Sequence, residues 1–166
     1  MSIAVTSASA SEVDTVLELL DDAVRWLAER GVRQWEVGQW KRARMLTAIE
    51  NGETYLARDG ERIVGSLNLA ESDEVIWPDD DGRALYVHRL VVARDAHGRG
   101  IGAAMLSWAE GRARERRRAF VRLDTACDSA ALRAYYEAQG FRLRDERLIT
   151  SPRGEWCSVR YEKAVR

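Results

Sequence analysis

The stretch that decides the fold is Leu85-Tyr-Val-His-Arg-Leu-Val-Val92, followed by Ala-Arg-Asp-Ala96 and by His97-Gly-Arg-Gly-Ile-Gly102. The apolar run predicts a strand, and the glycine-rich turn after it leads into a helical pattern that begins at Ala103. The first amides of a helix have no intrahelical partner, and the helix dipole makes that end positive. Because glycine has no Cβ, a phosphate can approach such amides closely. The segment therefore predicts a binding site for a phosphorylated ligand.

The patterns on either side of this segment predict strands and helices in the order βααβββαβαββ. Strands are expected at residues 3–6, 54–58, 62–69, 84–93, 119–124, 141–148 and 156–163, and helices at 13–27, 41–50, 103–118 and 129–138. Ser9 and Glu12 have the spacing of a capping box at the start of the first helix. Hairpins that flank strand–helix–strand units predict an α/β fold with a mixed, mostly antiparallel sheet of about seven strands and about four helices. Residues 1–166 are expected to form a single domain.

The composition indicates a globular protein. The chain has 166 residues, of which 46% are hydrophobic and 32% charged, and a net charge of -1. This charge does not favour nucleic acid or an anionic membrane as a partner. No apolar stretch could span a bilayer, and the N-terminus lacks the pattern of a signal peptide. We therefore expect a cytoplasmic protein; its preference for arginine over lysine fits a GC-rich bacterial genome.

The two cysteines, Cys127 and Cys157, lack metal-like spacing, and no metal is expected. A disulfide scaffold is not favoured, and each thiol is interpreted as a small apolar residue. A nucleophilic Cys127 is not favoured either, because no histidine lies near it in the sequence.

The glycine turn allows two interpretations. Gly98-x-Gly100-x-x-Ala103 satisfies the dinucleotide-binding pattern, and Asp124 follows at the spacing of a ribose-binding acid. Two features count against a dinucleotide fold. Residues 93–97 separate the strand from the first glycine, and the chain after Asp124 has room for only one helix and one hairpin.

The second interpretation rests on two motifs. His97-Gly-Arg-Gly-Ile-Gly-Ala103 resembles the [Q/R]-x-x-G-x-[G/A] signature of the GNAT acetyltransferases, with His97 in place of Gln or Arg. Ser129-Ala-Ala-Leu-Arg-Ala-Tyr-Tyr-Glu-Ala-Gln-Gly-Phe141 resembles the second motif of that family, a helix with a tyrosine four residues before Gly-Phe. Ser129 stands where many members carry asparagine. The element order agrees over nearly the whole chain, so the resemblance implies a GNAT-like fold and an acetyl-CoA-dependent N-acetyltransferase of bacterial type.

The resemblance also implies how acetyl-CoA would bind. The pyrophosphate would lie on the amides of the glycine turn, and the pantetheine arm would pair like an added strand with the end of the central strand. The cofactor-binding residues expected are Leu90, Val91, Val92, His97, Gly98, Arg99, Gly100, Ile101, Gly102, Ala103, Ser129 and Tyr136.

Catalytic roles follow from the same resemblance. Tyr136 would protonate the leaving sulfur; Tyr135 competes for this role but points about 100° away around a helix. The backbone N–H of Val92 would stabilise the oxyanion. His88 is placed where several relatives carry a catalytic glutamate, and histidine suits proton transfer at neutral pH. His88 could equally be a structural, partly buried histidine, with ordered water taking the proton, and Asp124 is interpreted as a turn or capping residue.

The acidic loop 71–81 carries six carboxylates around Trp77. It is either a solvated hairpin tip or a patch that attracts a cationic acceptor. Trp35, Trp40 and Trp77 either line the acceptor site or anchor their loops.

The sequence thus predicts an N-acetyltransferase that moves acetyl from acetyl-CoA to a primary amine of a small molecule or peptide, by direct attack in a ternary complex. The alternatives are a non-catalytic acyl-CoA-binding or regulatory module on the same fold and, less favoured, a dinucleotide-binding oxidoreductase. The partners expected are the amine acceptor, no nucleic acid and no membrane. The C-terminal hairpin offers an edge for a homodimer.

Overall fold

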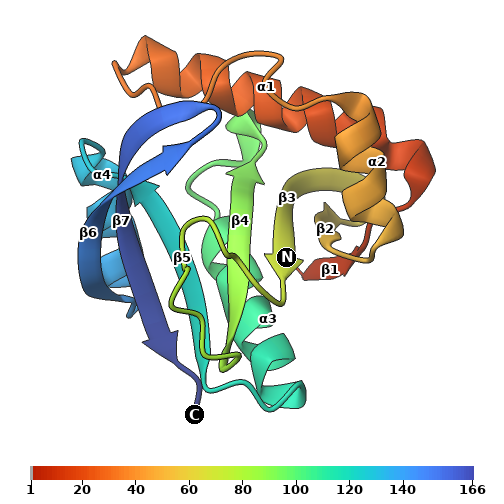
Figure 1. Cartoon of the computed structure of the whole chain (residues 1–166). Coiled ribbons are helices and arrows are strands. Elements are labelled where there is room, and N and C mark those ends of the chain that lie inside the picture. The colour runs from red at the N-terminus through yellow and green to blue at the C-terminus, as the bar shows by residue number, and fades with distance from the viewer. Residues whose placement is uncertain (1) are drawn as a thin grey trace. The chain divides into compact units, whose positions relative to one another are not determined.

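The computed structural model describes residues 2–166 and confirms the predicted order of elements (Figure 1). The strands are β1 (Ile3–Ser7), β2 (Thr54–Asp59), β3 (Arg62–Ala70), β4 (Ala84–Val92), β5 (Phe120–Ala126), β6 (Arg142–Ser151) and β7 (Gly154–Ala164). The helices are α1 (Val13–Glu29), α2 (Arg42–Glu50), α3 (Ile101–Glu115) and α4 (Ala130–Ala138), with short 3-10 turns η1 (Ala10–Glu12) and η2 (Arg94–Ala96). Neighbouring strands are hydrogen-bonded in the order β1-β2-β3-β4-β5-β7-β6. This is the mixed seven-stranded α/β fold that the sequence predicts.

The chain forms two compact units. The first comprises the described residues up to Leu69 together with Arg89–Trp108, and the second comprises Ala70–His88 together with Ala109–Arg166. Strand β4 is divided between the two units after His88, and helix α3 is divided after Trp108. Within residues 2–166, no helix combines the length and the apolar character needed to cross a membrane.

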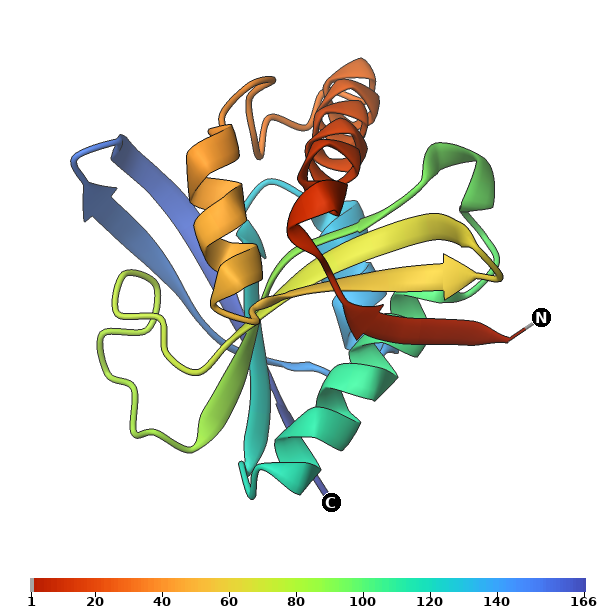
Figure 2. The ribbon, with the colours of Figure 1, turned by 90° about the vertical axis from the view of Figure 1, so that its right-hand side faces the viewer.

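In the first unit, α1 and α2 cover one face of β1, β2 and β3 (Figure 2). Successive side chains of a strand point to opposite faces. Leu56 of β2 therefore lies in the core with α1 and α2, while the neighbouring Tyr55 packs on Trp108 of α3, with ring centroids 4.5 Å apart. The helix side of this core contains Val13, Val16, Leu20, Val24, Trp40, Met45 and Ile49. The capping interaction is present: the Glu12 carboxylate accepts a hydrogen bond from the Ser9 backbone N–H at 2.8 Å.

Strand β3 approaches β4 closely at Gly65. A Cβ at this position would lie 2.9 Å from the carbonyl oxygen of Val91 and 3.1 Å from the sulfur of Met105. Glycine is therefore required here by the close packing of β3 against β4 and α3.

In the second unit, β7 pairs antiparallel with both β5 and β6, and β5 pairs in parallel with β4 over Ala84–Tyr86. Alternation places a row of polar residues on one face of these strands. They are Tyr86, His88, Arg122, Asp124, Ser158 and Arg160. The loop between β3 and β4 lies on this face, and α4 lies on the other (Figures 1 and 2).

Buried arginines hold that loop in place. The side chain of Arg160 is 2% exposed and donates hydrogen bonds to Asp79 of the loop at 2.6 Å and to Asp145 of β6 at 2.7 and 2.6 Å. Its guanidinium lies 4.4 Å from the ring centroid of Trp77, which is 1% exposed. The hydrogen bond from Arg160 lowers the pKa of Asp79 to about 2, and Arg160 likewise lowers the pKa of Asp145. The pairing compensates the desolvation of a buried guanidinium.

Candidate active site

Strand β4 carries His88 in the second unit and Leu90, Val91 and Val92 in the first. Between them, Arg89 has a φ of 51°, a left-handed conformation that residues with a side chain rarely adopt. The regular extension of the strand is therefore interrupted directly after His88. Sparsely populated backbone conformations of this kind are concentrated at functional sites.

The glycine turn leads into helix α3 through two glycines in the left-handed conformation. Gly98 and Gly100 have φ values of 76° and 74°, which glycine adopts without steric cost. Helix α3 begins at Ile101, and the first helical hydrogen bond runs from the N–H of Ala104 to the carbonyl of Gly100 at 2.9 Å. The amides between these positions, including those of Gly102 and Ala103, belong to the positive end of the helix.

Two side chains of this turn have partners within the first unit. His97 is hydrogen-bonded through Nε2 to the carbonyl of Val92 at 3.0 Å, and its ring packs edge-on against Trp26 at 5.0 Å. Arg99 forms an ion pair with Asp59 at 2.6 Å. His97 thus ties the turn to the end of β4, and the contacts that both residues would make with acetyl-CoA stay predictions.

Helix α4 of the second unit presents two of the expected residues. Ser129 is the N-cap, is 2% exposed, and its Oγ has no hydrogen-bond partner among residues 2–166. Tyr136 is 9% exposed and its ring packs against Phe141 and Tyr161. Burial raises the pKa of Tyr136, and the neighbouring Tyr135 and the charge of Asp124 act in the same direction. The Tyr136 hydroxyl is therefore kept protonated and able to donate.

His88 lies in a cluster that the sequence did not predict. Its Nε2 is 3.4 Å from an oxygen of Asp73, and one donor atom each of Asp73, His88 and Asp124 lie within 4.8 Å of one another. Asp124 accepts a hydrogen bond from the Ser158 hydroxyl at 2.7 Å. Burial raises the pKa of Asp124, whereas His88 and the Ser158 hydroxyl lower it. The interpretation of Asp124 as a turn residue was wrong, because β5 continues to Ala126 and the carboxyl joins this cluster.

These three residues have donor atoms close enough for a metal ion; Cys127, Glu146 and Cys157 also lie close together, but their two sulfur atoms are bonded to each other and offer no thiolate. The absence of a metal stays a prediction. The first group also has the composition of a proton-transfer site, one imidazole between two carboxyls.

The acidic loop is pinned by basic side chains. Asp79 binds Arg160, Asp81 forms an ion pair with Arg122 at 3.1 Å, and Glu71 forms one with Arg116 at 2.8 Å. These three carboxylates therefore attach the loop to the rest of its unit, and the role of the loop as a cation-attracting patch stays a prediction.

The tryptophans anchor their loops. Trp77 and Trp40 are 1% and 8% exposed, and Trp35 packs edge-on against Trp40 at 5.1 Å. Since Trp77 and Trp40 are buried in their own units, the alternative in which they line the acceptor site is not supported.

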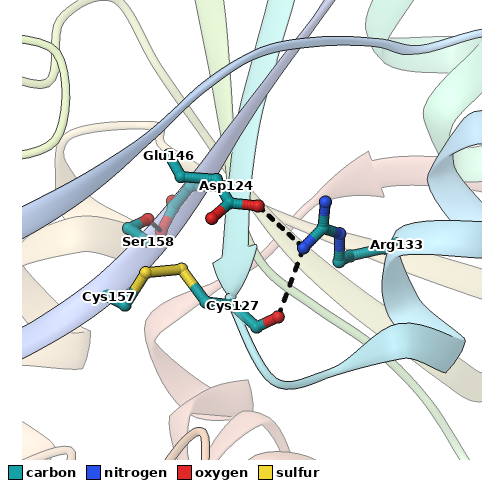
Figure 3. The surroundings of a disulfide bond; sticks show 6 residues. All are labelled: Asp124, Cys127, Arg133, Glu146, Cys157 and Ser158. Carbon is teal, nitrogen blue, oxygen red and sulfur yellow. Dashed lines mark hydrogen bonds and ion pairs between the residues drawn. A yellow bond between two sulfur atoms is a disulfide. The ribbon is translucent and has the colours of Figure 1, made fainter.

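Cys127 and Cys157 form a disulfide, with Cα atoms 5.5 Å apart (Figure 3). The expectation of two unpaired thiols was wrong. In the register of β5 and β7, Ala126 lies opposite Ser158, so the next residues face each other although they are 30 positions apart in sequence. Arg133 of α4 binds the carbonyl of Cys127 at 3.4 Å and the carboxylate of Glu146 at 2.9 Å (Figure 3). The start of α4 is thereby fixed to β7 and β6.

Comparisons with known proteins agree with the two motifs. The model of the GNAT acetyltransferase family matches residues 20–141. An uncharacterised N-acetyltransferase of Bacillus subtilis, YesJ, is 31% identical over 137 residues, which make up 78% of this chain and 76% of that protein. A GNAT-family acetyltransferase of Streptococcus agalactiae is similar in structure with a TM-score of 0.81 at 20% identity, covering 99% of this chain and 96% of that one. The putative acetyltransferase yncA of Salmonella typhimurium, solved with its cofactor acetyl-CoA, has a TM-score of 0.73 at 15% identity, and the match covers 100% of this chain and 95% of that one. Because the family model matches most of this chain, the chain belongs to the GNAT family of acetyl-CoA-dependent N-acetyltransferases.

Proposed function

We propose that this protein, as one acetyltransferase domain, transfers acetyl from acetyl-CoA to a primary amine of a small molecule or peptide by direct attack in a ternary complex. The observation that carries the proposal is the cluster of the second unit. It places the His88 imidazole beside two carboxyl groups, and the same unit contains the buried Tyr136, whose pKa is raised by burial and by the charges of Tyr135 and Asp124. A base and an acid are the groups that amine acetylation requires.

The glycine turn and its surroundings support binding of acetyl-CoA. The amides from Gly98 to Ala103 would hold the pyrophosphate, and the backbone of Leu90–Val92 would pair with the pantetheine arm. The buried, unpartnered Oγ of Ser129 supports a hydrogen bond to the same molecule, since buried polar atoms usually have a partner. The relative from Salmonella typhimurium carries acetyl-CoA.

The residues would act in the following order during one turnover. His88 takes one proton from the ammonium form of the acceptor, and the freed lone pair forms a bond to the acetyl carbon. The N–H of Val92 stabilises the negative charge that develops on the carbonyl oxygen. The carbon–sulfur bond then breaks, sulfur leaves with the electron pair, and Tyr136 protonates it. The second proton of the nitrogen returns to the Tyr136 oxygen, and the proton on His88 passes to water.

The disulfide favours direct attack over an acyl-enzyme. The only two cysteines of the sequence are Cys127 and Cys157, and they are bonded to each other. A cysteine nucleophile would need a free thiolate. Transfer through a cysteine would therefore require prior reduction of this bond.

Thermal unfolding with added ligands tests the binding step. Acetyl-CoA at 100 times its Kd should stabilise the protein by about 2.7 kcal/mol, and NADH should not stabilise it. Gly102→Val should remove the shift by blocking the amides at the start of α3. Gly111→Val, the same change further along this helix, should keep it. Stabilisation by NADH alone would instead favour the oxidoreductase, and stabilisation by acetyl-CoA without acetylation of any amine would favour a non-catalytic module.

A further inference from the structure

We infer that Asp73, supplied by the loop between β3 and β4, is a positioning residue that holds the His88 imidazole with its Nδ1 free to accept the proton of the amine. The inference rests on the proposed function, in which His88 is the base. It gives the acidic loop a role in catalysis that does not depend on attracting a cationic acceptor.

The contact between the two side chains is the first observation. Nε2 of His88 lies 3.4 Å from Oδ2 of Asp73, and the Asp73 side chain is only 9% exposed. The other carboxylate oxygen accepts a hydrogen bond from the N–H of Ile76 at 3.0 Å, which fixes the orientation of the group. Oδ2 is buried and accepts no hydrogen bond from any residue between 2 and 166. A buried acceptor without a donor is unfavourable, and an N–H on Nε2 of His88 is the donor beside it.

A neutral imidazole carries one N–H, and a carboxylate beside one nitrogen selects the tautomer with the hydrogen on that nitrogen. With the hydrogen on Nε2, the lone pair of His88 is on Nδ1. When Nδ1 takes a proton, the carboxylate of Asp73 stabilises the imidazolium, as the acid of a catalytic triad does. Asp73 thus orients the neutral imidazole of His88 and stabilises the imidazolium that forms when Nδ1 takes a proton.

The other groups around His88 are consistent with this role. Asp124 of β5 lies within 4.8 Å and is oriented by the Ser158 hydroxyl of β7. The charge of the same carboxyl adds to the rise that burial causes in the pKa of Tyr136 on α4. Burial and the neighbouring Asp73 raise the pKa of Asp124, whereas His88 and the Ser158 hydroxyl lower it. Two carboxyl groups, those of Asp73 and Asp124, therefore lie close to the His88 imidazole.

The loop places Asp73 accurately because it is fixed before and after this residue. Glu71 is bound by Arg116, and Asp79 is bound by the buried Arg160. Within the loop, the N–H of Trp77 donates to the carbonyl of Asp73 at 2.8 Å, and Trp77 is buried under the guanidinium of Arg160. A site held by fixed side chains keeps the geometry that proton transfer requires.

Asp73→Asn tests the inference in the full chain. We expect kcat/KM for the amine to fall, by no more than the about 10²–10⁴-fold that a positioned general base contributes. The acidic limb of the kcat/KM profile should move to lower pH, because the imidazolium loses a neighbouring negative charge. The KM for acetyl-CoA should not change, Asp73→Glu should restore part of the activity, and Asp14→Asn, an exposed acid of α1, should behave as the wild type.

A double-variant cycle separates this inference from the proposed function. Asp73→Asn should cost little when added to His88→Gln, because Asp73 acts only through His88. If His88→Gln retains full activity, the base assignment and the inference both fail. If His88→Gln is impaired but Asp73→Asn keeps the wild-type kcat/KM and acidic limb, only the inference is overturned. Loss of wild-type activity on treatment with EDTA, restored by Zn²⁺, would make the cluster a metal site and would also overturn it.

Discussion

Tyr135 and Tyr136 are adjacent in α4 and have different surroundings. Tyr136 is buried against Phe141 and Tyr161, whereas Tyr135 is only half-buried. Burial raises the pKa of both hydroxyls, and the charge of Asp124 adds to this effect at Tyr136. At the scale of the residue, the position of a side chain on its helix gives two identical groups different burial and different electrostatic surroundings.

Tyr136→Phe should lower kcat far more than it weakens acetyl-CoA binding. An interaction made mainly in the transition state appears in kcat, and general-acid catalysis contributes about 10²–10⁴-fold. Steady-state kinetics with acetyl-CoA as the varied substrate measures both quantities. Tyr135→Phe, the same change one residue earlier, is the control and should stay near the wild type. Equal kcat of Tyr136→Phe and the wild type would exclude Tyr136 as the acid.

Residues within local motifs could be predicted, and residues joined by tertiary structure could not. The spacing of Tyr136 before Gly140 and the glycines of the turn are local patterns. Asp73 reaches His88 only because the loop between them is held by arginines far along the chain. Asp124 was misread because the end of a strand is poorly defined by sequence alone.

At the scale of the element, the loop between β3 and β4 is held by charge. Its carboxylates lie against arginines of β5 and β7, and Trp77 fills the space between them. The sequence indicates an acidic, exposed loop because it does not reveal that the polar face of three strands needs covering. The structure supplies the reason: Arg122 and Arg160 are buried by this loop and require negative partners.

The loop predicts a specific pH dependence of stability. Arg160 holds the pKa of Asp79 at about 2, below the value of 3.8 for an unperturbed aspartate. The unfolded chain therefore binds the proton first as the pH falls, so the contribution of Asp79 is complete above about pH 4 and is lost towards pH 2. Urea unfolding should find Asp79→Asn less stable than the wild type at pH 7, with the difference shrinking between pH 4 and pH 2. Asp14→Asn, in an exposed pair with Arg42, should show no such difference, and a difference for Asp79→Asn that is constant with pH would contradict the assignment.

At the scale of the whole chain, the sequence predicts the order of helices and strands, but it does not predict the contacts between segments that are far apart in the chain. Periodicity, capping residues and hairpin turns act within a few residues, and they predict the seven strands and four helices that residues 2–166 form. The disulfide depends on the register of β5 against β7, which no local pattern specifies. Periodicity predicts where helices and strands lie along the chain, and the family resemblance predicts how they are arranged in the fold.

Cys157→Ser should destabilise the chain under oxidising conditions. Closing a loop across 30 residues restricts the unfolded chain, and such a bond contributes about 2–4 kcal/mol. Differential scanning calorimetry with and without dithiothreitol measures the effect. Reduction should lower the melting temperature of the wild type and leave that of Cys157→Ser unchanged. An equal melting temperature of oxidised and reduced wild type would show that the bond does not form or does not stabilise the fold.

The most direct test of the account is the initial rate of CoA release when acetyl-CoA and a primary amine are both varied, with the amine chosen from a panel of small molecules and peptides. Direct attack in a ternary complex predicts acetylation of the amine and double-reciprocal plots that intersect, with a rate that depends on His88 and Tyr136. Parallel plots, or tight binding of acetyl-CoA without acetylation of any amine in the panel, would contradict it.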